Sequence, residues 1–149
     1  MSARQIVVID TNVIIDAFLR SKDIRSRSSI EIIRGVDRGD YLGILPVPVL
    51  IEIYYVVLDI THDAKRAKKV LETILGSKNM RAQSIEEEHA MYAMEIYRDT
   101  NYFRLGRGDK LGKRDDSLSL VDCVVLAVGR SIPDSIVCSN ESKFSRIKG

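Results

Sequence analysis

The chain of 149 residues is long enough to fold as one domain with a sizeable core, and we expect a single domain over residues 1–149. Its 45% hydrophobic and 30% charged residues are typical of a globular protein and exclude a disordered one. The net charge of +2 excludes a uniformly basic nucleic-acid binder, so any such contact would need a local patch.

Membrane insertion and disulfide chemistry are not expected. The longest apolar region, around residues 47–60, is interrupted by Pro48, Glu52 and Asp59, and no signal peptide is evident. Cys123 and Cys138 lack the spacing of metal ligands. We therefore expect a reduced, cytoplasmic setting, with both thiols as small core residues.

The first half of the chain alternates strands with helices. Residues 5–9 and 41–45 are short apolar runs typical of strands covered on both faces. Helices are predicted over 11–20, 28–40, 46–60 and 61–76, with prolines in the first turn of the third. That third helix is apolar nearly all round, which indicates burial on more than one side, including against a second subunit.

The second half continues the same alternation. A short strand is predicted over residues 80–83, followed by a helix over 84–98 in which Ser84 and Glu87 form a capping-box pattern. An irregular segment rich in glycine and charge leads to an apolar helix over 118–130, capped by Asp116 or Ser117, and then to a strand over 135–139. Together these elements predict an α/β domain with a mostly parallel sheet.

Four acidic residues occupy related places in this pattern. Asp10 and Glu141 each follow a strand, whereas Glu52 and Asp122 lie in the first turns of apolar helices. Because ligands bind at the carboxyl ends of parallel strands, all four can converge on one side of the molecule. Crowded carboxylates repel one another, and a divalent cation removes that conflict. Hard oxygen ligands of this kind suit Mg²⁺ or Mn²⁺.

The order of these residues resembles that of the PIN domain ribonucleases, the family that includes the VapC toxins of toxin–antitoxin pairs. The opening motif of the family is matched by Asp10, Thr11 and Asn12, and its later acids by Glu52 and Asp122. Its closing motif, usually Thr-x-Asp-x-x-Phe, is matched by Ser139, Glu141 and Phe144, with Glu in place of Asp. The resemblance covers essentially the whole chain and implies a three-layer α/β/α fold.

The resemblance also implies metal-dependent hydrolysis of RNA phosphodiester bonds. Asp10 would be the central metal ligand, Asp122 and Glu141 would complete the site, and Glu52 would bind metal or orient the water. Thr11, Asn12 and Ser139 would support the carboxylates and the phosphate through hydrogen bonds. The longer side chain of Glu141 alters the reach of the fourth ligand by one methylene.

Each acid also has a purely structural alternative. Asp10 could be only a helix N-cap, Glu52 could pair with an arginine, Asp122 could favour a helix dipole, and Glu141 could be an ordinary loop acid. Asp115 and Asp116 are rival ligands better suited to capping. His62 and His89 have no evident catalytic partner and are expected at the surface.

Contacts to RNA would come from local positive charge. The irregular segment carries Arg104, Arg107, Lys113 and Arg114 around Tyr102 and Phe103, and Lys143 lies close to the predicted site. Cations hold phosphates and aromatic rings stack unpaired bases, although a solvated loop is an equal alternative. Basic residues over 65–69 fit an exposed helix surface better.

The main hypothesis is an endoribonuclease, which as a toxin would be restrained by an antitoxin protein. From the resemblance to the family, we expect a homodimer or a higher homo-oligomer. The alternative is a catalytically impaired PIN-like module that binds RNA or serves as a scaffold. A phosphoryl-accepting receiver domain would require an acceptor Asp after a middle strand, which "YLGILP" does not offer. A haloacid-dehalogenase phosphatase would require Asp where Asn12 stands.

Overall fold

The computed structural model describes residues 3–24, 26–101 and 118–140. Within these ranges, a parallel sheet contains the strands β1 (Gln5–Ile9), β2 (Tyr41–Pro46), β3 (Met80–Gln83) and β4 (Ile136–Cys138) in the order β3-β2-β1-β4. The helices are α1 (Thr11–Leu19), α2 (Ser26–Arg38), α3 (Val47–Thr61), α4 (Ala64–Leu75), α5 (Glu87–Asn101) and α6 (Leu120–Ser131).

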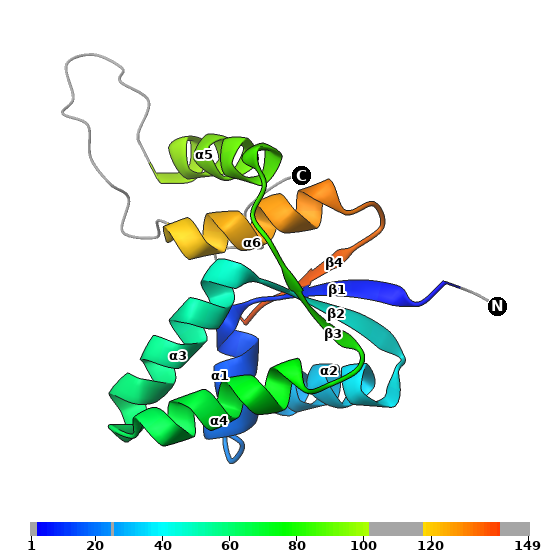
Figure 1. The fold of residues 1–149 in the computed structure, drawn as a ribbon. Coiled ribbons are helices and arrows are strands. Elements are labelled where there is room, and N and C mark those ends of the chain that lie inside the picture. The colour runs from blue at the N-terminus through cyan, green and yellow to red at the C-terminus, as the bar shows by residue number, and fades with distance from the viewer. Residues whose placement is uncertain (1–2, 25, 102–117, 141–149) are drawn as a thin grey trace.

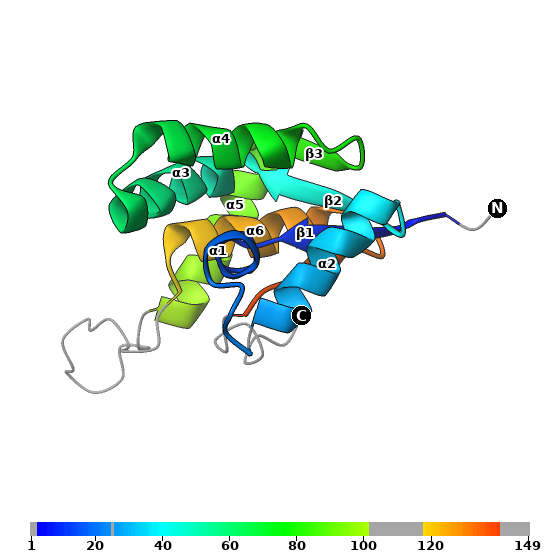
Figure 2. The ribbon, with the colours of Figure 1, turned by 90° about the horizontal axis from the view of Figure 1, so that it is seen from below.

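Helices cover both faces of the sheet, which gives the three-layer α/β/α architecture (Figure 1). Helix α6 packs against β1, β2 and β4, and α5 packs on the outer side of α6. On the opposite face lie α1, α2 and α4, as both ribbon views show (Figures 1 and 2). The predicted α/β/α fold with a mostly parallel sheet is therefore confirmed, and all the described strand pairs are parallel.

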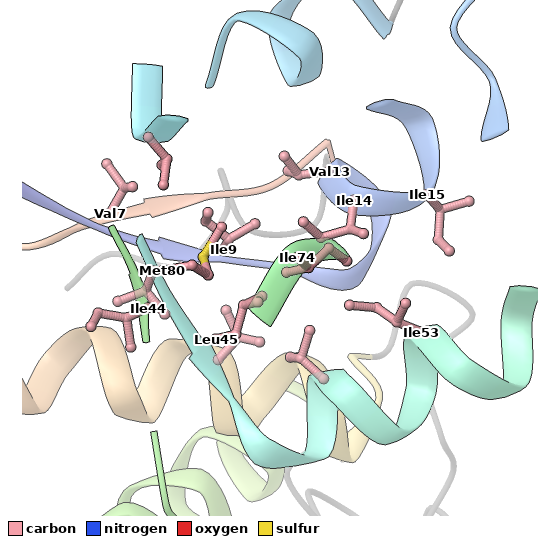
Figure 3. Close-up of a cluster of buried hydrophobic side chains, with 14 of the residues drawn as sticks. Val7, Ile9, Val13, Ile14, Ile15, Ile44, Leu45, Ile53, Ile74 and Met80 are labelled. Carbon is pink, nitrogen blue, oxygen red and sulfur yellow. The ribbon is translucent and has the colours of Figure 1, made fainter. Parts of the chain in front are cut away.

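The core explains why the central strands are apolar after their first residues. Val7, Val8 and Ile9 of β1 and Leu45 of β2 are almost fully buried because helices cover both faces of these strands. Side chains of the first helices and of β3 complete the same cluster (Figure 3). The register pairs Val8 with Ile44 on one side and with Val137 on the other, so β1 lies between β2 and β4.

Helices α2 and α4 begin at Ser26 and Ala64 instead of at the predicted residues 28 and 61, and the predicted caps of α5 and α6 are wrong. Helix α6 is capped by Ser119 rather than by Asp116 or Ser117: Asp122 N donates to Ser119 Oγ over 3.1 Å, and Ser119 N donates to Asp122 Oδ2 over 2.8 Å. This reciprocal capping box combines Ser with Asp at N3, where the common pattern has Glu or Gln. Helix α5 begins at Glu87 instead of Ser84 and continues to Asn101.

The prediction that His89 lies at the surface is wrong. This side chain also explains why α5 starts later than predicted. The residue is 6% exposed, and its Nδ1 accepts a hydrogen bond of 2.9 Å from Glu86 N. Ser131 Oγ donates to Val128 O, so it accepts from His89 Nε2, which lies 2.9 Å away. The neutral ring therefore joins the start of α5 to the end of α6. His62, in contrast, is exposed as predicted, at the end of α3.

Gly129 sets the spacing between α6 and β4. A Cβ atom at this position would lie 2.4 Å from Val137 Cγ2 of the strand. Valine is stiff at χ1, so the strand or the helix would have to move to admit a larger residue. The absence of a side chain at residue 129 therefore lets α6 lie close to the sheet.

We predict that Gly129→Ala lowers the free energy of unfolding by about 1–3 kcal/mol, as overpacking does. Alanine stabilises an unconstrained helix interior by about 1 kcal/mol relative to glycine, so the sign of the change is informative. Urea denaturation measures the effect. The second substitution Val137→Ala removes the clashing methyl groups and should restore part of the loss; a more stable single variant would contradict the close approach.

None of the helices in the described part of the chain has the length and apolarity needed to cross a membrane.

Candidate functional site

Four of the predicted site residues come from different elements that meet at one edge of the sheet. Asp10 follows β1 and Ser139 follows β4, and these neighbouring strands are parallel, so both residues lie at the carboxyl edge. Glu52 is in the second turn of α3, which follows β2, and Asp122 is in the first turn of α6. The starts of α1, α3 and α6 lie on this same side of the molecule (Figure 1).

Asp10 is the most buried acid of this group, with 1% exposure. Its Oδ1 accepts a hydrogen bond of 2.8 Å from Thr11 N, and its Oδ2 accepts one of 2.7 Å from Ser139 Oγ. Its own N–H donates to Cys138 O over 3.0 Å, which ties it to β4. The residue is therefore the N-cap of α1 and, at the same time, part of a cluster of polar groups from two strand ends.

Burial raises the pKa of Asp10 from 3.8 to about 6. The hydrogen bond from Ser139 opposes this effect, whereas the negative charge of Asp122 raises the pKa further. Thr11 N lowers the pKa of Asp10 and the charge of Glu52 raises it, both more weakly. The two other carboxylates therefore lie close enough to Asp10 to oppose its ionisation, as expected where like charges share a site.

Glu52 is joined to the start of α1 through Thr11. The Thr11 hydroxyl donates to Glu52 Oε2, so the side chain of Glu52 turns toward the end of β1. Glu52 is half-buried, and no arginine contacts its carboxylate among the ion pairs of the described residues. The contact with Thr11 connects the acid of α3 to the residue that follows Asp10.

Asp122 stabilises the start of α6 in addition to contributing a negative charge to the site. Its Oδ2 accepts from Ser119 N within the capping box, which holds the side chain at the start of α6. The neighbouring Cys123 is buried, and burial, followed by the charge of Asp122, raises the pKa of its thiol to about 12. That thiol stays protonated at neutral pH and fits the predicted role of a core residue.

The donor set suits a hard divalent cation, although the described residues do not complete a site. No group of three or more acidic, histidine or cysteine side chains within residues 3–24, 26–101 and 118–140 is close enough to hold a metal ion. A buried carboxylate opposed by two further carboxylates nevertheless gains most from a positive ion, and oxygen ligands are those that Mg²⁺ and Mn²⁺ prefer.

Several predicted residues lie outside the described part of the chain. They are the fourth acid Glu141, the basic residues Arg104, Arg107, Lys113, Arg114 and Lys143, and the rival ligands Asp115 and Asp116. Asn12 is described and is half-buried at the second position of α1.

Sequence reasoning missed a second polar cluster beside this site. Asp16 of α1 and Ser29 of α2 are buried, and both accept hydrogen bonds from the side-chain amide of Asn140, directly after Ser139. The signal was present in the sequence: Asp16 interrupts the apolar run "VIIDAFL", just as Asp10 interrupts the run before it.

The fold and the site together define a class: a three-layer α/β/α domain with acidic side chains at the carboxyl edge of a parallel sheet. The sequence matches the model of the PIN domain over residues 7–149. The chain therefore belongs to the PIN domain family.

Solved structures share this fold at low sequence identity. The first is VapC20 from Mycobacterium tuberculosis, described as a sarcin-ricin loop cleaving toxin, with a TM-score of 0.65 and 18% identity over 94% of this chain and 93% of that one. The second is VapBC2 from Rickettsia felis bound to a DNA fragment from its promoter, with a TM-score of 0.54 and 15% identity over 89% and 97% of the two chains. No curated protein sequence matches significantly.

Proposed function

We propose that the protein is an Mg²⁺- or Mn²⁺-dependent endoribonuclease that hydrolyses phosphodiester bonds, with residues 1–149 forming a single catalytic domain. The observation that carries the proposal is the buried carboxylate of Asp10, whose ionisation is opposed by the charges of Asp122 and Glu52. Membership of the PIN domain family supports a nuclease reaction at such a site.

We assign the roles of the residues from their positions. Asp10 is the central metal ligand, and Asp122, Glu52 and Glu141 are the further catalytic and metal-binding acids. Ser139 fixes Oδ2 of Asp10 and Thr11 N fixes Oδ1, so the orientation of the carboxylate is set before a ligand arrives. The Thr11 hydroxyl holds Glu52 in the same way. Asn12 is assigned to hydrogen bonding with the phosphate.

Metal bound at these acids would lower the pKa of water at the site and supply a nucleophile at neutral pH. The basic residues Arg104, Arg107, Lys113, Arg114 and Lys143 are the proposed contacts to the RNA backbone, since cations neutralise phosphates.

Cleavage assays on single-stranded and structured RNAs test the proposed reaction, with Mg²⁺, Mn²⁺ or EDTA in parallel. We expect fragments with either cation and intact RNA in EDTA. RNA that is bound but uncut under every condition would support the alternative of a catalytically impaired RNA-binding module. Cutting that continues in EDTA would contradict a metal-dependent mechanism.

The partner that we propose is an antitoxin protein that restrains the enzyme in the cytoplasm. The basis is the shared fold with VapC20, described as a toxin, and with VapBC2, described as bound to a DNA fragment from its promoter. Expression of the chain in a bacterial host tests this proposal: we expect growth arrest that the product of an adjacent gene relieves. Normal growth with an active nuclease would argue against a toxin.

We also propose that the protein is a homodimer. Helix α3 exposes large apolar side chains, among them Ile51 at 55% and Tyr55 at 64% exposure, one helical turn apart. Contiguous apolar surface of this kind is typical of protein–protein contacts.

Tyr55→Glu is therefore expected to convert the dimer to a monomer, because it places a charge within a desolvated surface. Light scattering coupled to size-exclusion chromatography measures the mass. Met94→Glu, at a similarly exposed position of α5, is the matched control and should leave the mass unchanged. A monomeric wild-type protein would contradict the proposed dimer.

A further inference from the structure

Asn140 is held at a point where three separate elements meet. Its Nδ2 donates to Asp16 Oδ2 over 2.6 Å and to Ser29 Oγ over 2.7 Å. Asp16 is on α1 and Ser29 is on α2, and their exposures are 7% and 0%. The chain that leaves β4 is therefore fastened to both helices on the opposite side of the sheet from α6.

The chemistry of these groups fixes the orientation of the amide. An ionised carboxylate only accepts hydrogen bonds, so the nitrogen of the Asn140 side chain has to face Asp16. The two hydrogens of that nitrogen then serve Asp16 and Ser29. Rotation of the amide would place its oxygen against the carboxylate and leave both buried acceptors without this donor, which is costly.

The three consecutive residues 138–140, at the end of β4 and directly after it, all form hydrogen bonds to other elements. Cys138 O accepts from Asp10 N, Ser139 Oγ donates to Asp10 Oδ2, and Asn140 is bound to Asp16 and Ser29. The backbone that carries Ser139 is thus fixed on both sides of that residue. A fixed Ser139 hydroxyl in turn fixes one oxygen of Asp10.

Asp16 itself is already engaged and does not point to a second metal site. While its Oδ2 accepts from Asn140, its Oδ1 lies 3.4 Å from Nη1 of Arg20, which is half-exposed. Because both oxygens of Asp16 already face hydrogen-bond donors, this carboxylate orients those donors instead of binding a cation. Its effect on the site would pass through Asn140 and Ser139.

We propose that Asp16, together with Ser29, is a positioning pair that fixes the Ser139–Asn140 segment and thereby the orientation of Asp10 for a divalent cation. This inference rests on the proposed metal-dependent function. Outer partners of metal ligands generally change affinity or activity by 10–100-fold, and we expect an effect of about that size.

The test measures Mn²⁺ affinity by electron paramagnetic resonance in the absence of RNA, so it does not depend on turnover. Asp16→Ala should weaken Mn²⁺ binding about 10–100-fold, and Ser29→Ala by about tenfold. Asp16→Asn keeps an acceptor oxygen for Asn140 and should restore most of the affinity. Arg20→Ala, which removes only the ion pair, is the matched control and should bind Mn²⁺ like the wild type.

A double-mutant cycle identifies the route of the effect. If Asp16 acts through Asn140, the variant carrying both Asp16→Ala and Asn140→Ala should bind Mn²⁺ no more weakly than Asn140→Ala alone. Multiplicative losses, or wild-type affinity in Asp16→Ala, would overturn the inference while leaving the proposed function intact.

Two further outcomes remain decisive. Absence of Mn²⁺ binding by the folded wild type would overturn the proposed function and this inference with it. Should Asp16→Ala fail to fold, Ser29→Ala carries the test, because it removes one acceptor of Asn140 and leaves the Asp16 carboxylate in place; unchanged affinity in that variant would overturn the inference.

Discussion

Replacing Asp10 with asparagine is expected to reduce metal-dependent RNA cleavage by more than about 100-fold, because losing a direct ligand should exceed the 10–100-fold effect of an outer partner. Asparagine is nearly isosteric and retains an oxygen that can accept from Thr11 N. Its amide nitrogen can donate to the Ser139 hydroxyl, so the local structure should persist. The single-turnover cleavage rate at saturating Mg²⁺ measures the effect.

Asp59→Asn is the matched control for that experiment. Asp59 lies on α3 like Glu52 but is exposed, so the same change of charge occurs away from the carboxyl edge of the sheet. Its cleavage rate should equal that of the wild type. Full metal-dependent cleavage by Asp10→Asn would show that the reaction does not depend on the carboxylate that we place at its centre.

In the absence of metal, the free energy of unfolding is expected to fall as the pH rises, because Asp10 loses its proton. The pKa of Asp10 is about 6 in the folded protein, against 3.8 as its ordinary value. The folded state therefore holds a proton that the unfolded state has already released, and the stabilisation present below about pH 4 is lost as the pH rises through about 6. A shift of about two units corresponds to roughly 3 kcal/mol.

Urea denaturation in EDTA at several values between about pH 4 and pH 8 measures this loss. Because other groups also titrate, the informative quantity is the difference between the wild type and Asp10→Asn, which cannot ionise at residue 10. The variant should gain about 2–3 kcal/mol of relative stability over this range. A constant difference between the two proteins would show that Asp10 ionises normally in the folded state.

Much of the fold follows from local patterns in the sequence. After their first residues, the runs "QIVVI" and "YLGIL" are apolar at every position because β1 and β2 are covered on both faces, and their alternation with helices predicts a layered α/β domain. The first residue of a helix is harder to predict, because it depends on which polar side chain caps the first helical turn. The buried side chain of His89 accepts a hydrogen bond from Glu86 N just before α5, and hydrophobic periodicity does not predict this contact.

The site residues that the sequence predicts best are charged side chains within apolar segments. Asp10 stands between two apolar segments, and this conflict between charge and burial is visible in the sequence itself. Asp16 presents the same conflict, but its resolution depends on Asn140 and Ser29, which are distant in sequence and meet it only in the folded protein. Pairings of this kind follow from the packing of α1 against α2, which local sequence does not specify.

Anomalous diffraction from crystals grown with Mn²⁺ shows whether Asp10 binds a divalent cation, since it locates the ion and its ligands at once. We expect a strong peak at the carboxyl edge of the sheet, with an oxygen of Asp10 among the ligands and carboxylates of Asp122, Glu52 or Glu141 completing the coordination. Asp10 without an ion beside it in such crystals, or a peak only at unrelated acids, would contradict a metal site centred on Asp10.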